Sequence, residues 1–152
     1  MTLGKTIASF FGIGLIKKGA GTVAAFIMCV LLYANTMCPV NINSLLPFFS
    51  ILILIVGVWS SREAERSWGK DSNKIVIDEV LGMAISLLFL PINLTTLCIG
   101  FVLFRFFDIV KPLYIKRAER FPGGWGVMMD DVIAGVYTNI VIQILIITNL
   151  LK

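Results

Sequence analysis

Two long stretches of the chain carry no charged residue, and they restrict the possible folds more than any other feature. Residues 19–61 and 80–104 contain no aspartate, glutamate, lysine or arginine. Hydrophobic residues make up 58% of the chain and charged residues 14%, whereas a soluble domain has about 45–50% and about 25%. We therefore expect an all-α protein, a polytopic bundle of helices embedded in a membrane.

Polar breaks divide these stretches into spans. The first break, residues 35–43, contains Pro39, and the second contains Pro91. Together with the last apolar stretch they predict about five transmembrane helices, each near the roughly 17–25 residues that a bilayer requires. The predicted spans are residues 22–37, 45–61, 76–90, 95–110 and 132–151. The expected domain is a single bundle covering residues 1–152.

The N-terminal stretch is apolar but short. Residues 6–16 have the length of a signal-peptide core, but Lys17 and Lys18 follow where small residues would mark a cleavage site. We expect a retained interfacial or re-entrant helix. Thr22 follows a glycine-containing turn and is expected to cap the next helix, whose start beside lysines suits an anion. A loop that only begins a helix would have the same composition.

Basic residues occur in every second segment between the predicted spans, so the basic segments all fall on one side of the membrane. The two breaks carry no charge, whereas residues 17–18, 62–74 and 111–120 carry most of the lysines and arginines. Because basic segments stay in the cytoplasm, the N-terminus is predicted to be cytoplasmic and the C-terminus external. The net charge of +4 is modest, and no aromatic–basic pattern of a nucleic-acid-binding protein is present. Membrane lipid, and no nucleic acid, is therefore the expected partner.

Acidic residues recur at the predicted cytoplasmic ends of three spans. Asp78 and Glu79 begin the third span, Asp108 lies near the end of the fourth, and Asp130 and Asp131 begin the fifth. A charge near hydrocarbon costs about 2.5–3.5 kcal/mol on insertion scales. Three such groups at one membrane depth therefore indicate a functional site.

The end of the fourth span also carries two cations. Arg105, Asp108 and Lys111 are spaced i, i+3 and i+6, which places them on one face of a helix that Pro112 then ends. Asp108 could simply bridge the two cations as a structural ion pair. The acids that begin the fifth span could simply complement its helix dipole.

The acids of these three groups outnumber the neighbouring cations five to two. Such an excess is hard to sustain beside lipid, and an all-oxygen set of ligands points to a hard ion such as Mg²⁺. The chain has no histidine, which excludes a Ser-His-Asp hydrolase and an HExxH zinc site, and its three cysteines have no zinc spacing. Adjacent acids point about 100° apart on a helix, so we expect one acid of each pair to enter the site.

Four short motifs surround these charges: residues 19–22, 75–82, 104–112 and 123–135. Together they resemble the phosphatidylglycerophosphatase A family, in the right order and over nearly the whole chain. The resemblance implies a multi-pass, Mg²⁺-dependent lipid phosphatase of the bacterial inner membrane, with phosphatidylglycerophosphate as its substrate. The chain departs from the family pattern at Lys17-Lys18, where a more apolar, proline-containing stretch is expected.

The resemblance also implies roles for individual residues. The catalytic and metal-binding residues would be Asp78, Glu79, Asp108, Asp130 and Asp131. The substrate-binding residues would be Lys18, Gly21, Thr22, Arg105, Lys111, Gly123 and Gly124.

The expected reaction is hydrolysis of the terminal phosphomonoester at the cytoplasmic face. The simplest route is metal-assisted in-line attack by water, with a carboxylate as base. An aspartyl-phosphate intermediate is the alternative, although the DxDx(T/V) motif of the aspartyl phosphatases is missing.

Two other functional classes stay open for the chain. An ion-coupled transporter would be expected to have its acids near the bilayer midplane, and a CDP-alcohol phosphotransferase would carry a DxxDGxxAR signature, which is absent.

Overall fold

The computed structural model describes residues 1–38, 42–70, 72–112, 115–118 and 120–151. These residues form helices and connecting turns, with no β-strand among them, so the predicted all-α class is confirmed. In chain order the elements are α1 (Leu3–Ala8), η1 (Ile13–Leu15), α2 (Ala20–Thr36), η2 (Ile42–Leu45), α3 (Leu46–Trp68), α4 (Ile77–Ser86), α5 (Leu94–Val110), α6 (Ile115–Ala118) and α7 (Gly124–Ile147).

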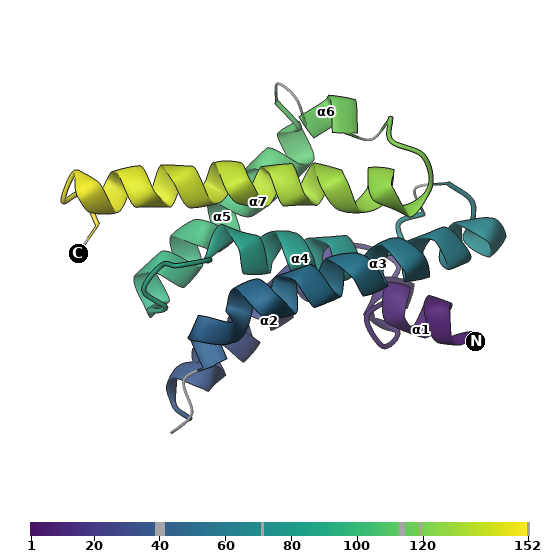
Figure 1. Cartoon of the computed structure of the whole chain (residues 1–152), viewed down its shortest axis with the longest axis horizontal. Helices are drawn as coiled ribbons and strands as arrows, with labels where there is room; N and C mark the ends of the chain where they lie inside the picture. The colour runs from purple at the N-terminus through teal and green to yellow at the C-terminus, as the bar shows by residue number, and fades with distance from the viewer. Residues whose placement is uncertain (39–41, 71, 113–114, 119, 152) are drawn as a thin grey trace.

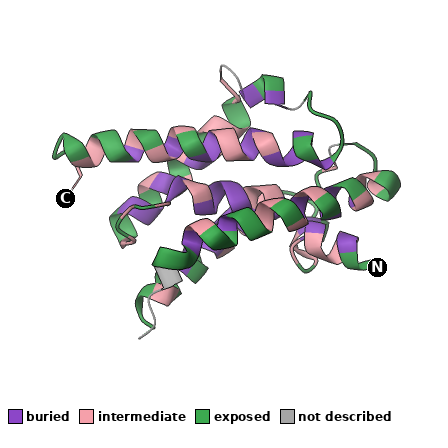
Figure 2. Ribbon diagram, in the orientation of Figure 1, coloured by how far each residue is buried: buried purple, intermediate pink, exposed green. Residues whose placement is uncertain are grey.

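Helix α4 lies at the centre of the molecule, between α7 on one side and α2 and α3 on the other (Figure 1). Most of its residues are buried, including Leu81 and Met83, as the colouring of Figure 2 shows. Its most extensive contact is with α7. A Cβ on Gly82 would overlap the backbone of Asp131, and a Cβ on Gly135 would overlap the carbonyl of Gly82. The two backbones therefore touch directly, which fixes the spacing of the acids on these helices.

Helix α4 is shorter than the span predicted at residues 76–90, because it ends at Ser86. The side-chain amide of Asn139 on α7 donates to the carbonyls of Ile85, Ser86 and Leu88 at 3.3, 3.1 and 2.9 Å. These bonds satisfy backbone groups that a helix end leaves open. The 10 residues of α4 extend about 15 Å, half the thickness of a bilayer's hydrocarbon core.

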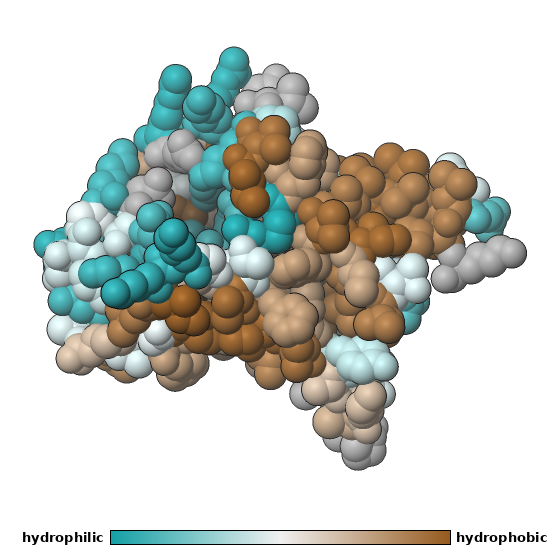
Figure 3. All heavy atoms as spheres, turned by 180° about the vertical axis from the view of Figure 1, so that it is seen from behind, coloured by the Kyte–Doolittle hydropathy of each residue, from teal (hydrophilic) through white to brown (hydrophobic). Residues whose placement is uncertain are grey.

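Among the described residues, two helices are long and apolar enough to cross a membrane, namely α3 and α7. Helices α2 and α5 have 17 residues each. Each predicted span thus contains a helix, but about five transmembrane helices stays a prediction. Exposed apolar side chains occur on all four of these helices, for example Phe26, Ile55, Val102 and Ile140. In Figure 3 hydrophobic atoms cover much of the visible face, and hydrophilic atoms gather at the end where α3 finishes and α7 begins.

Three predicted boundaries are wrong. Residues 6–16 do not form one helix, because α1 ends at Ala8 and η1 begins only at Ile13. Helix α2 is capped by Gly19 in a left-handed conformation without a side-chain hydrogen bond, so Thr22 lies inside its first turn. Helix α7 begins at Gly124, well before the predicted start of the fifth span. The predicted break at residues 35–43 includes residues 39–41, which lie outside the described residues.

Candidate active site

Five carboxylates from three helices meet in one small cleft. Asp78 and Glu79 come from the first turn of α4, Asp108 from the last turn of α5, and Asp130 and Asp131 from the second turn of α7. All five line a cleft of about 180 Å³, together with Ser72, Asn73, Ile75 and Lys111. The predicted convergence is therefore confirmed. The expectation that only one acid of each pair enters the site is wrong, since both members of both pairs line the cleft.

The two acids of α7 lie too deep to be ordinary helix-start acids. Asp130 and Asp131 follow the first turn of α7, which contains no acidic residue, and their exposed fractions are 5% and 2%. The helix dipole acts mainly within the first turn. Its complementation therefore does not explain why these carboxylates are buried.

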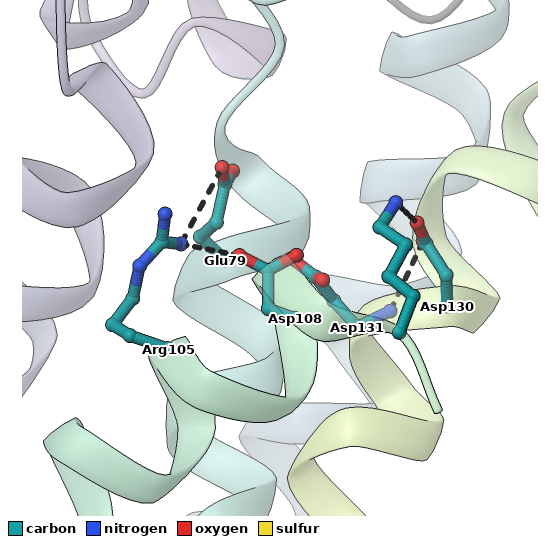
Figure 4. A network of polar contacts seen from close by, with 6 residues as sticks. Glu79, Arg105, Asp108, Asp130 and Asp131 are labelled. Atoms are coloured by element: carbon teal, nitrogen blue, oxygen red, sulfur yellow. Dashed lines mark hydrogen bonds and ion pairs between the residues drawn. The ribbon is translucent and has the colours of Figure 1, made fainter. Parts of the chain in front are cut away.

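Arg105 joins acids from two helices. Its Nη1 lies 2.6 Å from Oδ2 of Asp108, one turn along α5, and 3.9 Å from Oε1 of Glu79 on α4 (Figure 4). All three side chains are largely buried, where an unpaired charge would be costly. The arginine therefore holds the end of α5 against the start of α4.

Lys111 reaches the opposite side of the cleft. Its Nζ lies 2.7 Å from Oδ2 of Asp130, whose Oδ1 accepts a hydrogen bond from the backbone N–H of Asp131. Lys111 caps α5 in a left-handed conformation (φ 46°), directly before Pro112. A residue before proline avoids the helical conformation. Lys111 therefore leaves the helix face that its spacing predicted, and its charge is paired across to α7.

Three of the acids form a tighter group that fits a divalent cation. Asp78, Glu79 and Asp131 each offer a carboxylate oxygen, and these oxygens lie within 4.8 Å of one another. Oδ1 of Asp78 and Oε2 of Glu79 are buried and have no hydrogen-bond partner among the described residues. Mg²⁺ holds oxygens at about 2.0–2.1 Å, so ligands on opposite sides are about 4 Å apart. The donor set and its spacing both suit a hard ion.

A second cleft, lined by basic residues, adjoins the acidic one. It has a volume of about 380 Å³, and Lys17, Lys18 and Arg105 line it. It shares Asn73 and Glu79 with the acidic cleft. The predicted substrate-binding residues Lys18 and Arg105 thus lie beside the acids, and a cationic cleft and an acidic cleft open next to each other.

Gly21 positions one of the shared residues. It also lines the basic cleft, and a Cβ at this position would overlap Oε1 of Glu79. The backbone at the start of α2 therefore lies against this carboxylate. Gly21 was predicted as a substrate contact. In the structure its lack of a side chain leaves room for the carboxylate of Glu79.

Three other predicted substrate contacts line neither cleft. Thr22 is exposed on α2, and Gly123 lines a separate cleft between the end of α3 and the start of α7. A Cβ on Gly124 would overlap the carbonyl of Val58, so Gly124 allows α7 to pack closely on α3. Sequence analysis missed Asn73, which lines both clefts. The only signal was its place in the polar segment just before the third span.

A model of the phosphatidylglycerophosphatase A family matches residues 6–146. The chain belongs to this family. The phosphatidylglycerophosphatase A of Escherichia coli is 36% identical over 133 residues, which cover 86% of this chain and 76% of that protein. That of Haemophilus influenzae is 34% identical over 144 residues, covering 90% and 84%. A Bacteroides thetaiotaomicron protein, named as a candidate phosphatidylinositol-3-phosphatase, is 37% identical over 150 residues, covering 91% and 90%.

No solved structure matches the chain. Membership of the phosphatidylglycerophosphatase A family makes the chain a lipid phosphatase, and together with the two long apolar helices it indicates association with a membrane. Three of the four motifs that resemble the family, residues 75–82, 104–112 and 123–135, contribute lining residues to the acidic cleft, and residues 19–22 contribute to the adjoining basic cleft. The roles of the individual acids stay predictions.

Gly21→Ala should lower lipid-phosphatase activity by about 100-fold if Glu79 has its predicted catalytic role. The added methyl group would displace Glu79, and a displacement of about 1 Å at a catalytic group can cost that much. Gly4→Ala is the matched control, since its methyl group would also meet a glutamate carboxylate, that of Glu63, outside both clefts. The measurement is phosphate release by each purified variant. Near-normal turnover in Gly21→Ala would show that the position of Glu79 does not matter.

Proposed function

We propose that the chain hydrolyses the terminal phosphomonoester of phosphatidylglycerophosphate to give phosphatidylglycerol and phosphate. The observation that carries the proposal is the pair of adjoining clefts of opposite charge. The substrate has two phosphates, an inner diester and a terminal monoester. The acidic cleft with its cation would receive the terminal phosphate, and the cleft beside Lys17 and Lys18 would receive the inner one.

The proposed cofactor is Mg²⁺, held by Asp78, Glu79 and Asp131. When bound, it would neutralise charge on the phosphate oxygens and on the surrounding carboxylates. Without a cation these carboxylates would repel a phosphate dianion. Lys111 lines the acidic cleft and Arg105 lies beside Glu79 in its wall, so their donors would contact the remaining phosphate oxygens as charge develops.

The proposed nucleophile is water. A carboxylate of the cleft takes a proton from the water while the water oxygen bonds to phosphorus. The water attacks in line with the breaking bond between phosphorus and the glycerol oxygen. The glycerol oxygen leaves with a proton, so one water molecule is consumed per phosphate released. Asp108 and Asp130 are held in place by Arg105 and Lys111, which restricts the orientations that a base on this rim can take.

Removal of divalent metal should abolish phosphate release, and added Mg²⁺ should restore it. Asp131→Asn should raise the Mg²⁺ concentration for half-maximal rate by at least about tenfold, because it weakens one of the three grouped carboxylates. Glu63→Gln, which removes an acid of α3 outside the cleft, is the control and should leave this concentration unchanged. Full turnover by metal-stripped protein would contradict the proposed cofactor.

We further propose a five-pass arrangement in the cytoplasmic membrane, with the acidic cleft facing the cytoplasm. Helices α2, α3, α5 and α7 would each cross once. Helix α4 would reach only halfway, and residues 87–93 would complete the third crossing. Irregular backbone is tolerated in lipid where its polar groups are satisfied, and Asn139 satisfies three carbonyls at this point. The placement of the basic segments sets the orientation.

Cysteine labelling in cells tests this arrangement. In a variant without the three native cysteines, Ser67→Cys should react with a membrane-impermeant maleimide only after permeabilisation, because the end of α3 is placed in the cytoplasm. Thr148→Cys should react in intact spheroplasts. Both positions are exposed. The opposite pattern at both would invert the proposed orientation.

A second candidate substrate is a phosphatidylinositol phosphate. The observation that favours it is the name of the 37% identical relative from Bacteroides thetaiotaomicron. Such a lipid also carries a phosphomonoester beyond an inner phosphodiester, so the same two clefts would accommodate it. The additional cations at Lys17-Lys18 suit a head group that is larger than glycerol phosphate.

Initial rates on four phosphates in mixed micelles should separate these candidates. Phosphatidylglycerophosphate should react fastest, and phosphatidic acid and soluble glycerol phosphate at least about tenfold slower, since each lacks either the inner phosphate or the tails that restrict its position. Lys17→Gln/Lys18→Gln should slow the reaction of phosphatidylglycerophosphate but not that of phosphatidic acid. Equal rates on all would indicate a general phosphatase, and a faster rate on phosphatidylinositol 3-phosphate would favour the second candidate.

A further inference from the structure

A large hollow lined by basic residues lies beside the contact between α3 and α7. It consists of two joined clefts of about 470 and 460 Å³, which share Glu65, Lys70 and Gly123. Five exposed basic residues line it, and we call this group the basic basin: Arg62, Arg66, Lys70, Lys116 and Arg120. Glu65 is the one acid among the described residues that line the two clefts.

The basic basin is separate from both clefts of the active site. It shares no lining residue with the acidic cleft or with the cleft beside Lys17 and Lys18. It lies close by, because Gly126 in its wall is one helical turn before Asp130 on α7. The substrate's two phosphates already have cationic partners elsewhere, so the basin is left without a role in the proposed reaction.

Half-exposed aromatic side chains lie next to the basin. Trp59, Phe121 and Trp125 are 48%, 50% and 49% exposed. Trp59 lines a shallow cleft together with Arg62 and Arg66 of the basin. Aromatic rings in this setting are typical of the level of lipid head groups, and basic clusters at that level attract anionic lipids. A site for a soluble anion does not require apolar side chains beside its cations.

We propose that the basic basin binds the head group of an anionic phospholipid that is not the substrate. The phosphate would lie among the lysines and arginines, and the acyl chains would lie along the exposed apolar surface beside Trp59 and Trp125. Such a lipid would hold the ends of α3 and α7 at a fixed depth. Because α7 also carries Asp130 and Asp131 in the wall of the acidic cleft, and α3 packs against α7, the bound lipid would steady the active site.

The test is binding by the full chain in neutral detergent with EDTA present. The probes are dihexanoyl phosphatidylserine, dihexanoyl phosphatidylcholine and inorganic phosphate, and the apparent Kd is measured by thermophoresis. Lys70→Gln/Lys116→Gln should raise the Kd for phosphatidylserine at least about tenfold, because two cations near the head group are lost. Lys5→Gln/Lys74→Gln removes the same charge from two lysines that lie over Trp68, and should change it less than about twofold.

No outcome depends on hydrolysis, so failure here is distinct from failure of the proposed function. Equal loss of affinity in both double variants would show that binding depends on general surface charge and not on the basic basin. No loss of affinity in the basin variant would exclude the basin as the binding site. Inorganic phosphate binding as tightly as phosphatidylserine would overturn the lipid assignment, as would equal affinity for phosphatidylcholine. Arg66→Gln/Arg120→Gln provides a second basin variant in case the first does not fold.

Discussion

The direct contact between the backbones of α4 and α7 is the constraint on which the rest of the site depends. Helices with larger side chains at their interface stay about 8–10 Å apart, whereas glycines allow closer approach. At Gly82 and Gly135 an added Cβ would overlap backbone atoms of the other helix. The fully buried ring of Phe104 on α5 fills the remaining space beside Gly82. Three helices are thereby fixed at the depth where their acids meet.

The two cations of the site are distributed unequally over its five acids. Arg105 is paired closely with Asp108, and Lys111 with Asp130. The remaining three acids, Asp78, Glu79 and Asp131, are the ones whose oxygens gather within 4.8 Å. Burying like charges so close together is unfavourable unless something opposes them. The ion pairs thus balance the rim of the cleft and leave its negative charge concentrated at one point, which is the arrangement a divalent cation needs.

The convergence of the acids was predictable because consecutive predicted spans run in opposite directions. The start of the third span, the end of the fourth and the start of the fifth are then expected on the same side. The path of Lys111 was not predicted, although Pro112 carries the signal, because helical spacing was considered without the restriction that a proline places on its predecessor. The early end of α4 has no local signal, since the sequence stays apolar up to Leu90. The carbonyls at this end are instead satisfied by the amide of Asn139, which lies more than fifty residues away. Propensity and patterning do not register bonds of this range.

The charge pattern of the sequence also predicted orientation, but orientation alone does not explain where the cations lie in space. It requires only that lysines and arginines stay on one side of the membrane. Here they form three groups, at the acidic cleft, in the adjoining cleft and in the basic basin. In the proposed reaction the product keeps only the inner phosphate. It would therefore retain its contact with Lys17 and Lys18 but lose every attraction at the acidic cleft. Separate positions for the two phosphates would thus let the site hold the substrate more tightly than the lipid product. A single basic pocket for both phosphates would distinguish substrate from product less well.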